Sequence, residues 1–333
     1  MTMHTFPEQW HTRPLRVLDQ LLADGIEASL RHWLERHHLP DWLLYTGTQG
    51  SQRWLELSDS SVFTIAEDLT RLLAAQVGEL APRIAQHASL ISVGTGSGRK
   101  EAHLLAALSR RACRHYIAVD LSPSMLDLAM EAVAQLPLSV QPVLGRSEHL
   151  GAVLEGVPAP RLICVLGNHF SNYHADDFLA LLEPHLTPED RLLIDARIIP
   201  PQASRVWTER TAAAYSSPAN RRFNLGPLVD RGVDPAACTF ELALIGPADE
   251  PKQPLRTAKS IQIESDQVVQ FADGPTHTLP AGELLSMDFT HLHTRSSLRQ
   301  CFARNGWTIH HEHLSRGGGQ MLLLAAPPTQ EPA

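Results

Sequence analysis

Residues 90–100 read LISVGTGSGRK, and this stretch decides the fold of the chain. Its apolar start has the length of a buried strand, and glycines at every second position then indicate a tight turn. Glycine permits positive φ and lets a ligand lie directly against the backbone. Residues 101–108 are apolar at helical spacing, so we expect a helix whose free N–H groups point back at the turn. The stretch therefore predicts a strand, a ligand-binding turn and a helix in succession.

A second predicted strand, residues 116–119, ends in Asp120 about twenty residues after the turn. A carboxylate at the end of this strand can accept hydrogen bonds from both hydroxyls of an adenosine ribose. The dinucleotide fingerprint is G-x-G-x-x-G, whereas this chain has G-x-G-x-G, the spacing typical of an S-adenosylmethionine (SAM) turn. We therefore expect SAM as the cofactor. A nicotinamide or flavin cofactor, and a turn without any ligand, are the alternatives.

The composition bounds the class of protein. Of the 333 residues, 43% are hydrophobic and 19% are charged, which is typical of a globular protein with one large or two modest domains. The net charge of −8 argues against a nucleic-acid partner. The four cysteines are widely spaced, which favours reduced thiols. Neither a signal peptide nor a membrane-length apolar run is present, so we expect a cytoplasmic protein, monomeric or weakly dimeric, without a membrane partner.

Strands and helices alternate after the glycine turn. Compact apolar runs at 140–144, 162–166 and 192–195 are typical of buried parallel strands, and 177–186 is predicted to be a helix between the last two. This alternation predicts an α/β fold with a Rossmann-like, doubly wound parallel sheet. The carboxyl ends of the strands, and so the ligand, should share one edge of that sheet.

The alternation stops after residue 199 and returns near residue 295. We expect a SAM-binding domain from residues 58–199 plus 295–327, and a substrate-binding lobe from residues 1–57 plus 200–294. Within the lobe, 13–23 and 27–37 are predicted to be amphipathic helices. Residues 328–333 are expected to form a disordered tail.

Four local motifs carry a resemblance to a known family. They are GTGSGRK with Lys100, VDLSPSML with Asp120, VLGNHFSNY at 165–173, and SMDFTHLHTRSSL with Asp288 and Thr290. The chain resembles, over residues 45–326, the histidine-specific N-methyltransferases, whose best-known member makes trimethylhistidine in ergothioneine biosynthesis. The resemblance implies a Class I SAM-dependent methyltransferase fold with a second, substrate-binding lobe.

The resemblance also implies the site residues. Those expected to bind the cofactor are Gly94, Thr95, Gly96, Gly98, Lys100, Asp120, Leu121, Arg146, Ser147, Gly167 and Asn168. Those expected to bind the substrate are Tyr45, Asn172, Tyr215, Asp288 and Thr290, with Tyr215 and Asp288 also as catalytic residues. An amide such as that of Asn172 can accept a hydrogen bond from an amine and donate one to a carboxylate. Asp288 and Thr290 are two apart, so in a regular strand they would share one face.

The chain departs from the family pattern at three places. Ser61 and Val62 stand where paired tyrosines are usual, Arg146 and Ser147 stand where an acid and an aromatic would contact adenine, and Ser92 replaces an acid in the first strand. A pocket of different shape follows, so we expect free histidine to be a poor substrate. No metal is expected at residues 310–313, because the alternation of a strand splits their histidines between two faces. None is expected at Asp288 and its neighbouring histidines either, because methyl transfer does not need a metal.

The sequence thus predicts a SAM-dependent N-methyltransferase acting on an amino acid or a small amino-acid-derived metabolite. An O- or C-methyltransferase of a secondary metabolite, a nicotinamide-dependent oxidoreductase and a non-catalytic SAM-binding protein are the alternatives.

Overall fold

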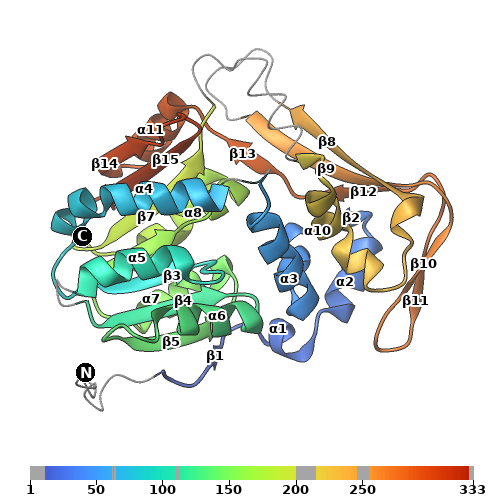
Figure 1. Ribbon diagram of the computed structural model, residues 1–333, viewed down its shortest axis with the longest axis horizontal. Helices are drawn as coiled ribbons and strands as arrows, with labels where there is room; N and C mark the ends of the chain where they lie inside the picture. Colours follow the sequence, from blue (N-terminus) through green and yellow to red (C-terminus); the bar gives the residue numbers. More distant parts are fainter. Residues whose placement is uncertain are drawn as a thin grey trace. The chain divides into compact units, whose positions relative to one another are not determined.

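The computed structural model describes residues 12–61, 63, 65–109, 113–199, 215–245 and 255–329. Within these ranges the chain forms two compact units (Figure 1). The first contains residues 12–20, 65–198 and 295–329, and the second contains 21–63 and 199–294 with the gaps given above.

An eight-stranded sheet forms the centre of the first unit (Figure 1). Its strands, in spatial order, are β1 (Arg16–Val17), β5 (Ser139–Leu144), β4 (His115–Asp120), β3 (Ser89–Val93), β6 (Arg161–Val165), β7 (Arg191–Arg197), β15 (Gln320–Ala326) and β14 (Thr308–Leu314). The first six run parallel, and β15 is antiparallel to both β7 and β14. The predicted α/β fold with a Rossmann-like parallel sheet is confirmed.

Helices cover both faces of this sheet. The helices α7 (Leu150–Glu155), α8 (Ala175–Leu182) and α11 (Arg295–Arg304) pack on one face, against alternate strand residues such as Ile91 and Ile163. The helices α4 (Ile65–Leu80), α5 (Arg99–Leu108) and α6 (Pro123–Val133) pack together over the other face (Figure 1). Strands buried on both sides read as continuous apolar runs, which is why the sequence revealed them.

Short 3-10 helices connect the larger elements of the first unit. They are η2 (Ala81–Arg83), η4 (Ser147–His149), η5 (His169–Asn172) and η6 (Glu183–His185).

The N-terminal segment departs from the prediction. Instead of a helix over 13–23, residues 16–17 pair with β5, and α1 (Gln20–Asp24) is a helix of only five residues. Residues 12–20 therefore extend the large sheet and do not join the predicted lobe. The predicted tail begins within the described residues, with Pro328 and Thr329, while 330–333 lie outside them.

The second unit combines helices with small sheets. Its helical elements are α2 (Glu27–Leu34), η1 (Asp41–Tyr45), α3 (Gly47–Ser58), α10 (Pro218–Val229) and η7 (Pro235–Ala237). Strand β9 (Leu255–Ile263) pairs with β8 (Cys238–Ile245), β12 (Leu284–Met287) and β13 (Thr290–Leu292), and β12 also pairs with β2 (His38–Leu39). A hairpin of β10 (Gln267–Gln270) and β11 (Thr276–Leu279) completes it. Apolar residues from these helices and strands form a core of the unit's own.

Candidate functional site

The glycine turn joins the end of β3 to the start of α5. Gly94, Gly96 and Gly98 all have positive φ, at 64°, 56° and 70°. A Cβ on Gly98 would lie only 2.7 Å from the Cα of Ala129 in α6, so this glycine allows two helices to approach closely. At Gly96, the nearest atom to a Cβ would be the Lys100 Nζ, 3.9 Å away. The backbone at Gly96 is thus open to a ligand.

Asp120 lies beside this turn, at the end of β4. One carboxylate oxygen accepts the Gly96 N–H (2.8 Å), and the other accepts the Ser122 N–H (3.0 Å). Burial raises the pKa of Asp120, and these two hydrogen bonds oppose that rise. Leu121 contributes a further backbone hydrogen bond, and a carboxylate has about four lone-pair sites, so Asp120 keeps capacity for a hydroxyl donor.

Lys100 brings a positive charge to the same edge of the sheet. Its ammonium donates to the Thr95 carbonyl (3.2 Å) and lies next to Gly96 and Gly167. Its side chain is 14% exposed. The turn therefore combines an open backbone with two charged groups. The Asp120 carboxylate can accept hydrogen bonds from a diol, and the Lys100 ammonium can pair with a carboxylate. These features fit SAM, which carries a ribose and an amino-acid end.

The turn after β6 carries Gly167 and Asn168, with φ of 86° and 64°. Asp195 of β7 accepts their backbone N–H groups, at 2.6 Å for Gly167 and 3.1 Å for Asn168. Gln320 of β15 also donates to Asp195 (2.7 Å). Burial raises the pKa of Asp195, against the hydrogen bonds from Gln320, Asn168 and Gly167. Sequence reasoning treated Asp195 only as the end of an apolar run, although a carboxylate at a strand end was a usable signal.

The next predicted cofactor residues lie in and before η4. Ser147 is buried, and its hydroxyl is 2.6 Å from the Tyr173 hydroxyl and 3.2 Å from the His169 Nε2. Arg146 pairs with Asp19 (Nε to Oδ2, 2.7 Å). Sequence reasoning missed His169 and Tyr173 as partners of Ser147, although both stand within the quoted motif VLGNHFSNY.

Burial sets the charge of His169. It lowers the pKa of His169 to about 4, with a further contribution from Lys100, so the ring is neutral near pH 7. The ring also lies 3.1 Å from where a Gly94 Cβ would stand, so a side chain there would require the His169 ring to shift by a few tenths of an ångström.

The remaining predicted residues of the first unit are placed as follows. Thr95 is buried, with its hydroxyl 2.5 Å from the Tyr116 hydroxyl. Leu121 is half-buried directly after Asp120, and Asn172 is half-buried at the end of η5.

In the second unit, Asp288 lies in the gap between β12 and β13. Its carboxylate accepts the Asp41 N–H (2.8 Å) and a hydrogen bond from the His38 ring (3.1 Å). Burial alone would raise the pKa of Asp288, but the hydrogen bonds from His38 and Asp41 bring it below the usual value. The side chain is still 45% exposed.

Asp288 and Thr290 do not lie in one regular strand, because β12 ends at Met287 and β13 begins at Thr290. Ser286 pairs with Ser260 and Thr290 with Thr257, so one extra residue is inserted opposite β9. Such a bulge interrupts the alternation of side chains. Thr290 is buried, and its N–H donates to the Thr257 hydroxyl (3.3 Å).

The other predicted residues of this unit, Tyr45 and Tyr215, contact residues of α10. Tyr45, the last residue of η1, packs edge-on against Phe223 of α10, with ring centroids 5.0 Å apart. Tyr215 is buried and precedes α10, and its carbonyl accepts a hydrogen bond from the Asn220 side chain of α10 (2.6 Å). Ser61 is exposed, and Val62 lies outside the described residues.

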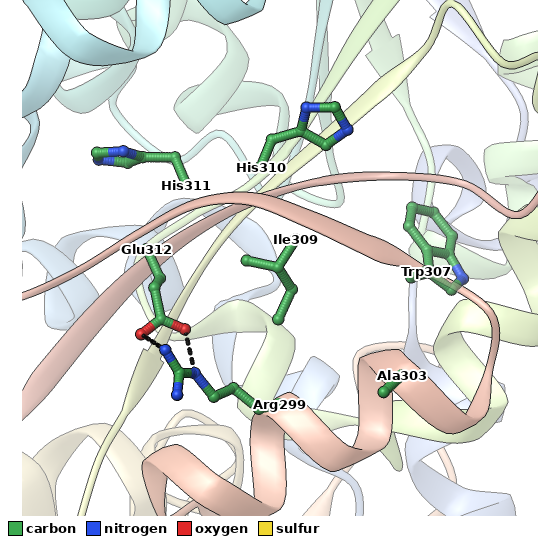
Figure 2. Close-up of a pocket in the computed structure, with 7 residues that line it drawn as sticks. All are labelled: Arg299, Ala303, Trp307, Ile309, His310, His311 and Glu312. Carbon is green, nitrogen blue, oxygen red and sulfur yellow. Dashed lines mark hydrogen bonds and ion pairs between the residues drawn. The ribbon is translucent and has the colours of Figure 1, made fainter.

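A separate cavity of about 560 Å³ lies between α11 and β14 (Figure 2). Arg299 and Glu312 form an ion pair across its wall (2.6 Å). Strand β14 begins opposite the end of β15, which itself pairs with the amino end of β7. The cavity thus lies toward the opposite end of the strands from the glycine turn, and no predicted site residue lines it.

The described residues lack two further features. They contain no group of three or more histidine, cysteine or acidic side chains arranged to hold a metal ion. Among their helices, none is both long and apolar enough to cross a bilayer.

Comparison with known proteins gives a family. The model of the family described as "histidine-specific methyltransferase, SAM-dependent" matches residues 22–326. Similar solved structures include a SAM-dependent methyltransferase from Clostridium acetobutylicum, 10% identical, with a TM-score of 0.39 over 81% of this chain and 94% of that chain. Another is SAM-bound CalS10 from Micromonospora echinaspora, an amino pentose methyltransferase of calicheamicin biosynthesis. It is 15% identical, with a TM-score of 0.38, and the match covers 83% of this chain and 95% of that chain. No curated protein matches the chain.

The family match spans most of the chain and includes the glycine turn, Asp120 and Lys100. The chain therefore belongs to the family of histidine-specific, SAM-dependent methyltransferases, and SAM is its cofactor.

Proposed function

We propose that this methyltransferase acts on a nitrogen atom of an amino acid or a small amino-acid-derived metabolite. The observation that carries the proposal is the state of Asp288. Its carboxylate is 45% exposed, and its hydrogen bonds keep its pKa below the usual value. A carboxylate held ionised in this way suits a partner that presents N–H groups or a positive charge.

The cofactor residues have separate roles in this proposal. When bound, SAM supplies an electrophilic methyl group, which a neutral nitrogen atom can attack with its lone pair. Asp120 holds the ribose hydroxyls, and Lys100 holds the carboxylate of the amino-acid end. The carbonyl of Thr95 and the neighbouring Glu101 keep the Lys100 ammonium close to the turn.

Asp288 orients the acceptor and does not serve as its base. A carboxylate with a lowered pKa is a weak proton acceptor. The acceptor nitrogen therefore releases its proton to water before the methyl group is transferred. Asn172, Tyr45, Tyr215 and Thr290 are proposed as further contacts to the acceptor, with the Asn172 amide suited to an amino group and a carboxylate together.

Mass spectrometry of reaction mixtures tests the proposal. The protein is incubated with SAM and a panel of amino acids, including histidine, and of amino-acid-derived metabolites. We expect a gain of methyl groups on an amino or ring nitrogen of at least one panel member, located by fragmentation. The matched control, Asp120→Ala, should give no methylated product at the same SAM concentration. Methylation confined to oxygen or carbon atoms would contradict the proposal.

A further inference from the structure

Glu101 is a completely buried acidic residue in the first turn of α5. One of its carboxylate oxygens, Oε1, accepts a hydrogen bond from the Ser92 hydroxyl of β3 (2.9 Å) and lies 3.6 Å from the Lys100 Nζ. The other oxygen, Oε2, is buried, and none of the residues that the structure describes donates to it. A buried carboxylate oxygen without a donor is costly, so its presence calls for a physical reason.

Two other buried carboxylates lie close enough to Lys100 to interact with its charge, those of Asp120 and Asp195. Both oxygens of Asp120 accept backbone N–H groups. Both oxygens of Asp195 also have donors, from the Gly167–Asn168 turn and from Gln320. Of these three carboxylates, that of Glu101 is the one with an oxygen that accepts no hydrogen bond from the described residues.

The position of Glu101 matches the charge pattern of one part of the cofactor. The amino-acid end of SAM carries an ammonium and a carboxylate on the same carbon atom. Lys100 and Glu101 are consecutive residues of opposite charge directly after the glycine turn. An ammonium brings three donors, of which one would satisfy Oε2.

We propose that Glu101 is the residue that receives the ammonium of SAM's amino-acid end, through Oε2, while Ser92 holds its other oxygen in place. Strand β3 thus supplies only a hydroxyl, and helix α5 supplies the carboxylate. The proposal concerns cofactor binding, so it does not depend on the identity of the methyl acceptor.

Calorimetric titrations with three ligands test the proposal. They are S-adenosylhomocysteine, its analogue without the α-amino group, and 5′-methylthioadenosine, which lacks the whole amino-acid end. Glu101→Gln should weaken the binding of S-adenosylhomocysteine roughly 10- to 100-fold, as expected when a hydrogen bond between charged groups is lost. The same variant should bind the other two ligands as tightly as the wild-type protein does.

Matched variants separate binding from folding. Asp120→Asn should weaken all three ligands, because all three contain the ribose. Glu101→Asp keeps the charge on a shorter side chain and should weaken only S-adenosylhomocysteine, by less than Glu101→Gln. Unchanged binding of S-adenosylhomocysteine to both Glu101 variants would overturn the proposal. An equal loss for all three ligands would also overturn it, because Glu101 would then act only on the fold of the turn.

Discussion

At the scale of single residues, His169 makes the stability of the protein depend on pH. Burial lowers the pKa of His169 to about 4, against an unfolded value near 6.5. Between these two pH values the unfolded chain binds the additional proton, so the free energy of unfolding rises with pH across this range. The full contribution is about 3 kcal/mol, lost progressively as the pH falls from 6.5 to 4.

Replacing this histidine should remove that dependence. We expect His169→Gln to flatten the plot of unfolding free energy against pH between 4 and 6.5, measured by urea titration. The control is His103→Gln, which changes an exposed histidine of α5 and should leave the slope as it is in the wild-type protein. A slope that persists in His169→Gln would show that other groups cause it.

Two glycines of the turn should respond differently to the same substitution. In Gly98→Ala, the new Cβ would meet the α6 backbone at 2.7 Å, which adds overpacking to the strain of positive φ. We expect a loss of stability of about 2–4 kcal/mol. In Gly96→Ala, the Cβ meets only the end of the Lys100 side chain, so the loss should be about 1–2 kcal/mol.

Cofactor affinity should show the opposite ranking. Thermal unfolding without ligand and calorimetry with S-adenosylhomocysteine measure the two effects separately. Among variants that remain folded, Gly96→Ala should lose more affinity than Gly98→Ala. A larger affinity loss in Gly98→Ala would contradict the assignment of Gly96 to ligand contact.

At the level of residues, local structure could be predicted where the signal lay within a short stretch of sequence. The glycine spacing, the strand before it and Asp120 all lie within about thirty residues, as in a single βαβ unit, and their positions follow from local structure. Asp195, Ser92 and Glu101 gained their roles from partners on other strands and helices. A single sequence does not reveal such partners, because strand order and helix rotation decide them.

At the scale of elements, one buried ion pair links β6 to the segment before β7. Arg161 and Asp190 are both buried, with 2.7 Å between Nη2 and Oδ2. The Arg161 guanidinium also donates to the carbonyls of Leu154 and His185. Asp190 additionally accepts the N–H of Thr187, so the pair fixes the ends of several elements.

Asp190→Ala would leave a buried guanidinium without its counter-ion. We expect a loss of about 3–5 kcal/mol in unfolding free energy, measured by urea titration. Glu67→Ala breaks the exposed pair with Arg71 on α4 and should cost less than about 1 kcal/mol. Similar values for the two variants would contradict the structural role assigned to Asp190.

The helix expected over 13–23 shows why some elements were mispredicted. The leucines of this segment are spaced as in a helix, yet residues 16–17 form a strand beside β5, more than 120 residues later in the chain. Long-range pairing overrode a local pattern. The bulge between β12 and β13 has a similar origin, because register along β9 is a property of two strands together.

At the scale of the whole molecule, the two units carry different parts of the proposed chemistry. The glycine turn, Asp120 and Lys100 belong to the first unit, and Asp288 belongs to the second. Changes in one set should therefore alter cofactor affinity, and changes in the other should alter acceptor turnover.

Asp288→Ala should lower kcat/KM for the true acceptor by roughly 10- to 1000-fold, since a charged hydrogen-bond partner is lost. The dissociation constant of S-adenosylhomocysteine should stay unchanged, which calorimetry measures. Asp273→Ala is a suitable control, because it removes another carboxylate of the same unit, paired with Arg31. Normal turnover in Asp288→Ala would remove Asp288 from the acceptor site.

The substrate was the least predictable property. The departures at Ser61 and Val62 lead us to expect that free histidine is methylated poorly. Fold and cofactor follow from motifs that many substrates share, whereas acceptor choice depends on the shape of a pocket.

The hydrogen bond from Gln320 to Asp195 has a consequence for the timing of synthesis. Gln320 lies 125 residues after Asp195 in the sequence, and its strand β15 is synthesised after the other strands of the large sheet. Asp195, which accepts the backbone N–H groups of the Gly167–Asn168 turn, therefore lacks one of its donors until β15 has been synthesised. A nascent chain can form the parallel strands earlier, but Asp195 gains its full set of hydrogen bonds to the Gly167–Asn168 turn and to Gln320 only once β15 has joined the sheet.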